Sequence, residues 1–155
     1  MARAFLSLGS NLGDRGEYLR NALPIISNGE LMRVSQVYAT EPVGGVAQDD
    51  FWNVVVELET AASPIELLER ARRAESEAQR VREVRWGPRT LDVDVLLVGD
   101  LISLDEEVLV PHPRMWERRF VLAPLRELAP ELVSDELYES AQGAVVALGT
   151  LDSLR

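Results

Sequence analysis

Four segments in the first hundred residues have apolar patterns that predict strands. Residues 2–9 and 51–60 are dominated by apolar and β-branched side chains, and residues 30–40 alternate in part between apolar and polar. The fourth segment, RTLDVDVLLVGD at 89–100, contains an apolar run over 91–98 that is interrupted only by Asp92 and Asp94. These four segments predict a sheet as the centre of the fold.

Two helices are predicted between these strands. Asp14 with Glu17, and Ser63 with Glu66, are capping-box pairs, and an apolar stripe at helical spacing follows each pair. Pro24 lies within the first stripe, so we expect that helix to kink or end early. The order of elements is therefore β-α-β-β-α-β, which is that of an α+β, ferredoxin-like sandwich.

The C-terminal third predicts an extension to this sandwich. We expect a small hairpin through 101–104 and 106–110, and helical pieces near 114–128 and 136–148. A chain of 155 residues, 46% hydrophobic, is most simply one globular domain, and we expect a single domain over residues 1–155.

Composition excludes several classes of protein. The chain has no cysteine, and therefore neither a disulfide framework nor a thiolate metal site. A net charge of −10 argues against general nucleic-acid binding, which needs a basic surface. The sequence contains no apolar run of membrane-spanning length and no signal-like N-terminus, so we expect no membrane association and a cytoplasmic location.

The two aspartates in the fourth strand share one face of it. Because side chains in a strand alternate, Asp92 and Asp94 point one way while Leu91, Val93 and Val95 point the other way. Neighbours on the same face lie roughly 6–7 Å apart, and two carboxylates that close repel each other unless a cation lies between them. The strand therefore predicts a cation site.

Arginines are concentrated just before this strand. All 16 basic residues are arginine, and seven of them lie between residues 70 and 89: Arg70, Arg72, Arg73, Arg80, Arg82, Arg85 and Arg89. We expect the first three to lie on a solvated helix face, with Glu66, Glu69 and Glu77 as partners one turn away. The last four lead into the aspartate strand, and two interpretations remain open. The arginines could pair with the aspartates in structural ion pairs, or both could face a polyanion, with carboxylates holding Mg²⁺ and arginines holding phosphates.

Three other polar residues are candidates of lower specificity. Glu75 falls on the apolar stripe of the second helix, where an acid is more often an arginine's partner than a catalyst. His112, the only histidine, would ordinarily be a surface or packing residue. The amide of Asn53 offers a donor and an acceptor edge that would suit a flat heterocycle or, equally, loop backbone.

Taken together in order, four motifs resemble one known family. The motifs are GSNLGDR, YATEPVG followed by FWN, RWGPRTLDVDVLL, and VPHPRMWERRFVLAPL, and they resemble the 6-hydroxymethyl-7,8-dihydropterin pyrophosphokinases of the folate pathway. The resemblance spans about residues 4–132. It implies a ferredoxin-like fold and an ATP- and Mg-dependent diphosphotransferase with two Mg²⁺ ions. Such an enzyme passes the β,γ-pyrophosphoryl group of ATP to the hydroxymethyl oxygen of the pterin and releases AMP.

The resemblance also implies a role for each matching residue. Asp92 and Asp94 would bind the two Mg²⁺ ions and, with Arg82 and Arg89, act in catalysis. The implied ATP contacts are Glu75, Arg80, Arg82, Trp86, Arg89, His112 and Arg118. The implied pterin contacts are Thr40, Val43, Phe51, Asn53, Trp86 and Phe120. Arg82 would lie on a loop that closes over the triphosphate, and whether it or Arg80 or Arg85 closes the site is left open.

Two rival classes of function remain at this point. A non-catalytic ferredoxin-like binding module would have no reason to concentrate arginines and two aspartates at one site. A two-metal phosphodiester hydrolase would explain the aspartates but normally needs further carboxylate or histidine ligands. We expect small-molecule substrates and a monomer.

Overall fold

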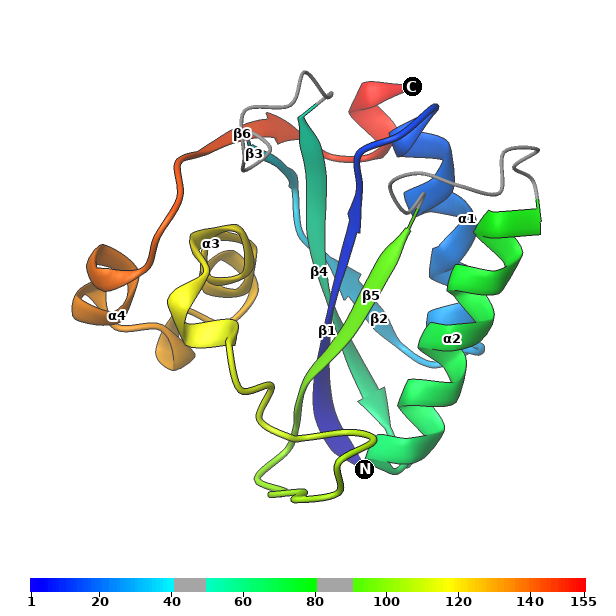
Figure 1. The fold of residues 1–155 in the computed structure, drawn as a ribbon, viewed down its shortest axis with the longest axis vertical. Helices are drawn as coiled ribbons and strands as arrows, with labels where there is room; N and C mark the ends of the chain where they lie inside the picture. The colour runs from blue at the N-terminus through cyan, green and yellow to red at the C-terminus, as the bar shows by residue number, and fades with distance from the viewer. Residues whose placement is uncertain (41–49, 81–90) are drawn as a thin grey trace.

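The computed structural model describes residues 1–40, 50–80 and 91–155 (Figure 1). Its strands are β1 (Ala2–Ser10), β2 (Met32–Val34), β3 (Val37–Thr40), β4 (Phe51–Thr60), β5 (Asp92–Val98) and β6 (Val145–Gly149). Its helices are α1 (Arg15–Ser27), α2 (Pro64–Arg80), α3 (Arg119–Leu128) and α4 (Asp135–Ser140). Short 3-10 turns lie at Met115–Glu117, Pro130–Leu132 and Asp152–Leu154.

The strands form an antiparallel sheet in the order β5-β1-β4-β3-β6, and β2 also pairs with β4. The central position of β1 between β4 and β5 is the arrangement expected of a ferredoxin-like βαββαβ unit, so the predicted fold is confirmed. The predicted second strand is instead divided into β2 and β3 at Ser35. The Ser35 hydroxyl accepts a hydrogen bond from the backbone N–H of Val55 (3.0 Å), so a side chain takes over one bond of the ladder there.

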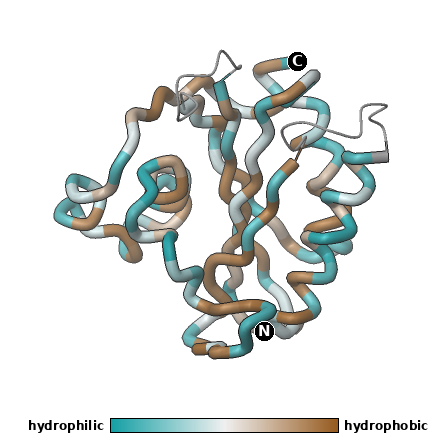
Figure 2. The backbone as a smooth tube through the Cα atoms, viewed as in Figure 1, coloured by the Kyte–Doolittle hydropathy of each residue, from teal (hydrophilic) through white to brown (hydrophobic). Residues whose placement is uncertain are grey.

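Helices cover both faces of the sheet (Figure 1). α1 and α2 pack on one face over a core that includes Leu6, Val56 and Leu67, and α3 packs on the other face over Phe5, Leu96 and Leu122. Figure 2 shows that the hydrophobic colour is concentrated in the central strands, between these two helical layers. A strand buried on both faces needs apolar residues at successive positions, which explains the nearly unbroken apolar runs in the sequence.

Both predicted helix starts are confirmed. A carboxylate oxygen of Asp14 accepts from the backbone N–H of Glu17 (3.1 Å), and Ser63 and Glu66 make the reciprocal bonds of a capping box, each 3.3 Å long. Of the two outcomes expected at Pro24, a kink or an early end, the early end is wrong, because α1 continues through it to Ser27. Pro24 lies in the last turn, where its missing N–H removes a single backbone bond.

The C-terminal extension was predicted only in part. α3 and α4 are helical as expected, but the predicted helix over 136–148 ends at Ser140, and Val145–Gly149 form strand β6 against β3. Adjacent β-branched residues such as Val145 and Val146 favour a strand when an edge is available to pair with. The predicted hairpin over 101–110 is reduced to an isolated bridge between Ser103 and Val110.

The prediction that Arg70 lies on a solvated helix face was also wrong. It is buried, and its guanidinium donates to Glu30 (2.5 Å) and to the carbonyl of Ile26 (3.1 Å) instead of facing solvent. The hydrogen bond from Arg70 lowers the pKa of the Glu30 carboxyl. In the described part of the chain, no helix is both long enough and apolar enough to cross a membrane.

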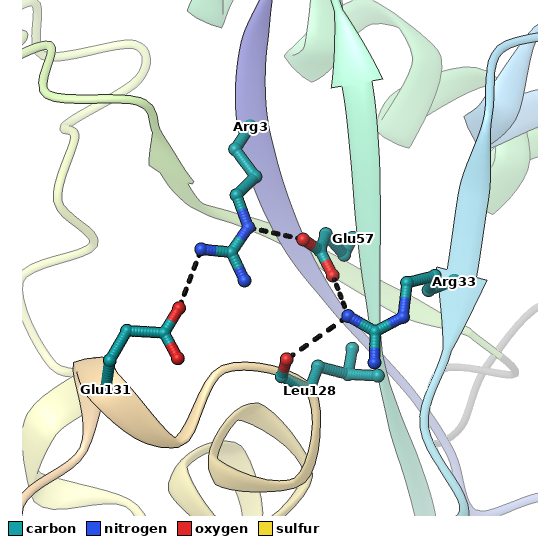
Figure 3. Close-up of polar contacts among 5 residues, drawn as sticks. All are labelled: Arg3, Arg33, Glu57, Leu128 and Glu131. Atoms are coloured by element: carbon teal, nitrogen blue, oxygen red, sulfur yellow. Dashed lines mark hydrogen bonds and ion pairs between the residues drawn. The ribbon is translucent and has the colours of Figure 1, made fainter.

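A buried carboxylate ties the α3 layer to the sheet (Figure 3). Glu57 on β4 accepts from the guanidinium groups of Arg3 on β1 and Arg33 on β2, the latter at 2.8 Å. Arg33 also donates to the carbonyl of Leu128 at the end of α3 (3.3 Å), and Arg3 donates to Glu131 (2.7 Å) in the turn that follows. Glu57 therefore connects three strands to the C-terminal end of α3.

Replacing this carboxylate should destabilise the fold. Glu57→Gln leaves two guanidinium groups without their shared anion, and we expect the free energy of unfolding to fall by about 1–3 kcal/mol. Chemical denaturation measures the change. Glu59→Gln is the matched control, because Glu59 is an exposed carboxylate two residues along the same strand. Equal stability of the two variants would contradict a role for Glu57 in holding the layers together.

Candidate functional site

The floor of the site is formed where β4, β1 and β5 lie side by side. In the strand register Gly9 of β1 lies opposite Asn53 of β4 on one side and opposite Asp92 of β5 on the other. Ser7, two residues earlier on β1, lies opposite Asp94. Because alternate side chains share a face, the aspartates and Asn53 emerge on the same side of the sheet as Phe5, which is the α3 side.

A cavity of about 1270 Å³ opens above this floor. Its wall contains eight of the residues singled out in the sequence: Thr40, Phe51, Asn53, Glu75, Asp92, Asp94, Arg118 and Phe120. These residues come from β3, β4, α2, β5 and the start of α3, so the fold brings together motifs separated by up to eighty positions. One cavity of this size can hold a nucleotide and a second small molecule.

The aromatic half of the cavity is organised around Asn53, which is buried. Its side-chain nitrogen donates to the carbonyl of Tyr38 (3.2 Å) and to the hydroxyl of Thr40 (3.3 Å). The two donors of the amide are thus engaged by β3, and the carbonyl oxygen is the atom left to face a ligand. Phe51 and Phe120 line the same cavity from β4 and α3.

The acidic half is organised around Asp94, whose carboxylate lies 3.8 Å from Nε2 of His112. Nδ1 of His112 accepts a hydrogen bond from the backbone N–H of Arg114 (3.2 Å), so Nε2 carries the proton of the neutral ring. Burial lowers the pKa of His112, the Asp94 carboxylate opposes that shift, and the cations of Arg118 and Arg114 add to it. His112 is therefore a neutral imidazole that presents its Nε2–H toward the carboxylate side of the cavity.

Glu75 joins α2 to the aspartate strand. Its carboxylate accepts from the backbone N–H of Val93 (2.9 Å), the residue between the two aspartates. The acid lies in the wall of the cavity. The interpretation of Glu75 as an arginine's partner stays a prediction.

The two aspartates suit a magnesium ion that is shared with a phosphate ligand. Among residues 1–40, 50–80 and 91–155, no group of three or more His, Asp or Glu side chains is placed to hold a metal by itself. Mg²⁺ commonly takes only one or two protein carboxylates and completes its shell with water and substrate phosphates. The donor set of Asp92 and Asp94 therefore fits Mg²⁺ bound together with a polyphosphate.

Several predicted site residues lie outside the described part of the chain: Val43, Arg82, Arg85, Trp86 and Arg89. Arg80 is the last residue of α2, and its backbone alone is described. Their assignments therefore remain predictions.

Other residues of the cavity wall were not identified from the sequence. Ser7, Gly9 and Trp116 are among them, as are four residues of the segment 140–144 near the C-terminus. Gly9 could have been suspected, since a glycine within an apolar strand often marks a close approach. The C-terminal segment carries no recognisable motif.

A family model and individual relatives both identify the family that the sequence motifs resemble. Residues 5–130 match the family model of 7,8-dihydro-6-hydroxymethylpterin-pyrophosphokinase. The chain is 47% identical over 132 residues to the 2-amino-4-hydroxy-6-hydroxymethyldihydropteridine pyrophosphokinase of Bacillus subtilis (strain 168), covering 83% of this chain and 79% of that one. It is 44% identical over 136 residues to the Haemophilus influenzae enzyme of the same name, covering 86% and 85%.

The fold is also similar to that of a solved structure. The crystal structure of Plasmodium falciparum HPPK-DHPS with SDX-DHP superimposes with a TM-score of 0.63 at 16% identity. The match covers 90% of this chain and 43% of that one, so the present chain spans less than half the length of the solved protein. At this level of identity the likeness shows the fold alone.

Proposed function

Because the chain belongs to the 7,8-dihydro-6-hydroxymethylpterin-pyrophosphokinase family, we propose that it transfers the β,γ-pyrophosphoryl group of ATP to the hydroxymethyl oxygen of 6-hydroxymethyl-7,8-dihydropterin, a step in folate biosynthesis that releases AMP. The observation that carries this proposal is the single cavity that unites Asn53 and two phenylalanines with Asp92 and Asp94. Incubation with ATP, Mg²⁺ and the pterin should yield AMP and the pterin diphosphate. AMP formation that did not depend on the pterin would contradict the proposal.

The aromatic half would bind the pterin. The carbonyl oxygen of Asn53 is an acceptor, and the amino group and ring N–H of a pterin are donors along one edge. Phe51 and Phe120 would flank the flat ring, with Thr40 holding Asn53 in orientation. Val43 and Trp86, by family resemblance, would complete this half.

The acidic half would bind the triphosphate. Asp92 and Asp94 would hold two Mg²⁺ ions, which when bound neutralise charge on the phosphates and acidify the attacking hydroxyl. Arg118 lines the cavity, and together with Arg80, Arg82 and Arg89 it would contact phosphate oxygens. Glu75 and His112 would lie beside the nucleotide, and the neutral His112 could donate through Nε2 without adding charge.

The reaction needs no nucleophile from the protein. The hydroxymethyl oxygen of the pterin attacks the β-phosphorus, the bond from that phosphorus to the oxygen bridging the α- and β-phosphates breaks, and AMP leaves with that oxygen. The chain's residues bind and orient the two substrates so that this displacement is in line. Because the substrate supplies the nucleophile, a chain without cysteine can support this reaction.

The rival functions fit the site less well. A two-metal hydrolase would need additional metal ligands. His112 lies near, with Nε2 3.8 Å from the Asp94 carboxylate, but no group of three or more His, Asp or Glu side chains in the described residues is placed to hold a metal. A non-catalytic module would have no use for paired carboxylates in the wall of a ligand cavity. We further propose that residues 1–155 act as one catalytic domain, as a monomer and in the cytoplasm.

Asn53 supplies a selective test of the pterin half. In Asn53→Ala the ring edge loses its acceptor, and we expect pterin binding to weaken by about 1–3 kcal/mol while nucleotide affinity changes much less. Titration calorimetry with each ligand separates the two effects. Equal losses for pterin and nucleotide would show that Asn53 supports the cavity as a whole and does not read the pterin.

A further inference from the structure

One wall of the cavity is built by residues that follow the family match. The match ends at residue 130, whereas Leu137, Ser140, Gln142, Gly143 and Ala144 line the cavity. We call residues 140–144 the strap. Figure 1 shows it passing from α4, beside α3, to the start of β6. The strap thus links the side of the cavity formed by Arg118 to the side formed by Thr40.

Backbone hydrogen bonds hold the strap at its middle residue and just beyond its C-terminal end. The N–H of Gln142 donates to the carbonyl of Glu117 (2.9 Å), and the N–H of Arg119 donates to the carbonyl of Gln142 (3.0 Å). Just beyond the C-terminal end Val145, the first residue of β6, pairs with Thr40. The backbone of Gln142 is therefore fixed against the residue that precedes Arg118.

The side chain of Arg119 organises the strap further. Its guanidinium donates to the carbonyls of Tyr138 (3.1 and 3.2 Å), Glu139 (3.0 Å) and Gly143 (3.3 Å). Five donors in a rigid fork suit this cluster of carbonyls, which no other side chain could satisfy as completely. Arg119 therefore acts as a positioning residue for the strap.

Gln142 is the strap residue with polar atoms to offer a ligand. The hydroxyl of Ser140 is engaged by the carbonyl of Glu136, and Gly143 and Ala144 have no polar side-chain atoms. Within the described part of the chain, the side-chain amide of Gln142 has no hydrogen-bond partner, and the residue is exposed in the cavity wall. Its amide can both donate and accept.

We propose that Gln142 is a substrate-contacting residue that hydrogen-bonds the pterin from the strap. The inference rests on the proposed function, because it takes the part of the cavity between Thr40 and Phe120 to be the pterin half. Asn53 offers the pterin an acceptor from the sheet, and Gln142 offers both a donor and an acceptor from a second wall. A ring with donors and acceptors along its edge is held in one orientation when two separate walls contact it.

Equilibrium binding of each substrate tests the assignment. Titration calorimetry of Gln142→Ala, with Mg²⁺ and a non-hydrolysable ATP analogue present, should show pterin affinity about 3–10-fold weaker. The affinity for the ATP analogue should change less than about twofold, the scatter expected for a residue that does not contact it. Glu139→Ala is the matched control, because it removes an exposed side chain next to the strap that does not line the cavity.

Arg119→Ala provides an independent variant, because it removes the side-chain hydrogen bonds to Tyr138, Glu139 and Gly143 and leaves the side chain of Gln142 unchanged. It should raise KM for the pterin as well, with KM for ATP little changed. Unchanged pterin affinity in Gln142→Ala, or equal losses for both ligands, would overturn the inference. A wild-type protein that binds both substrates but makes no AMP would contradict the proposed function instead.

Discussion

Replacing either aspartate of β5 should nearly abolish turnover and leave the fold intact. Asp92→Asn and Asp94→Asn each keep the shape of the side chain and remove one anionic metal ligand, so we expect kcat to fall by about a thousandfold or more. The fold should tolerate the change, because both carboxylates lie in the wall of a cavity, and removing one relieves repulsion between like charges.

Steady-state kinetics together with thermal unfolding measure the two parts of this prediction. Asp100→Asn is the matched control: it is the same substitution at an exposed aspartate that follows β5 and does not line the cavity. The reaction should depend strictly on Mg²⁺ and stop when EDTA is added. Near-normal kcat in either cavity variant would exclude the assignment of metal binding to this pair.

The core of the site could be predicted because strand periodicity is a local property. Asp92 and Asp94 face one side and Val93 and Val95 the other, as the two-residue repeat of a strand requires, and the valines are buried in the core beneath α1 and α2. The capping boxes at Asp14 and Ser63 are equally local, which is why both helix starts were correct.

Features that depend on distant parts of the chain could not be predicted in the same way. Arg70 had glutamates at helical spacing in the sequence, but its partner Glu30 follows α1, forty residues away. The sequence predicted a helix over 136–148, because the residues of β6 pair as a strand only when the chain returns to the edge of β3. The sequence did not predict that the strap lines the cavity, for the same reason: only the folded chain brings it there.

Gly9 illustrates how one position can connect the two halves of the site. It lies between Asn53 and Asp92 in the sheet, with the face it shares with them toward the cavity. A Cβ atom on Gly9 would lie 2.8 Å from the side-chain oxygen of Asn53, closer than real contacts of this kind. A shift of the Asn53 amide that relieves this contact would strain its hydrogen bonds to Tyr38 and Thr40.

Gly9→Ala should therefore weaken pterin binding by displacing the one atom of Asn53 that faces the ligand. We expect a loss of about 10–100-fold, comparable to the 1–3 kcal/mol expected of Asn53→Ala, because the displaced amide no longer presents its oxygen correctly and also obstructs the ring. Folding stability should not fall in proportion, since alanine loses less backbone entropy than glycine in a strand.

A double-mutant cycle decides whether the added methyl acts through Asn53. In the Asn53→Ala background the colliding oxygen is gone, so adding Gly9→Ala should cost pterin affinity less than about twofold, and the two losses should be far from additive. Titration calorimetry on the four proteins gives the coupling free energy directly. Additive losses would mean that the methyl blocks the cavity floor by itself. In that case the glycine would be required for the close approach of the ligand and not for the orientation of Asn53.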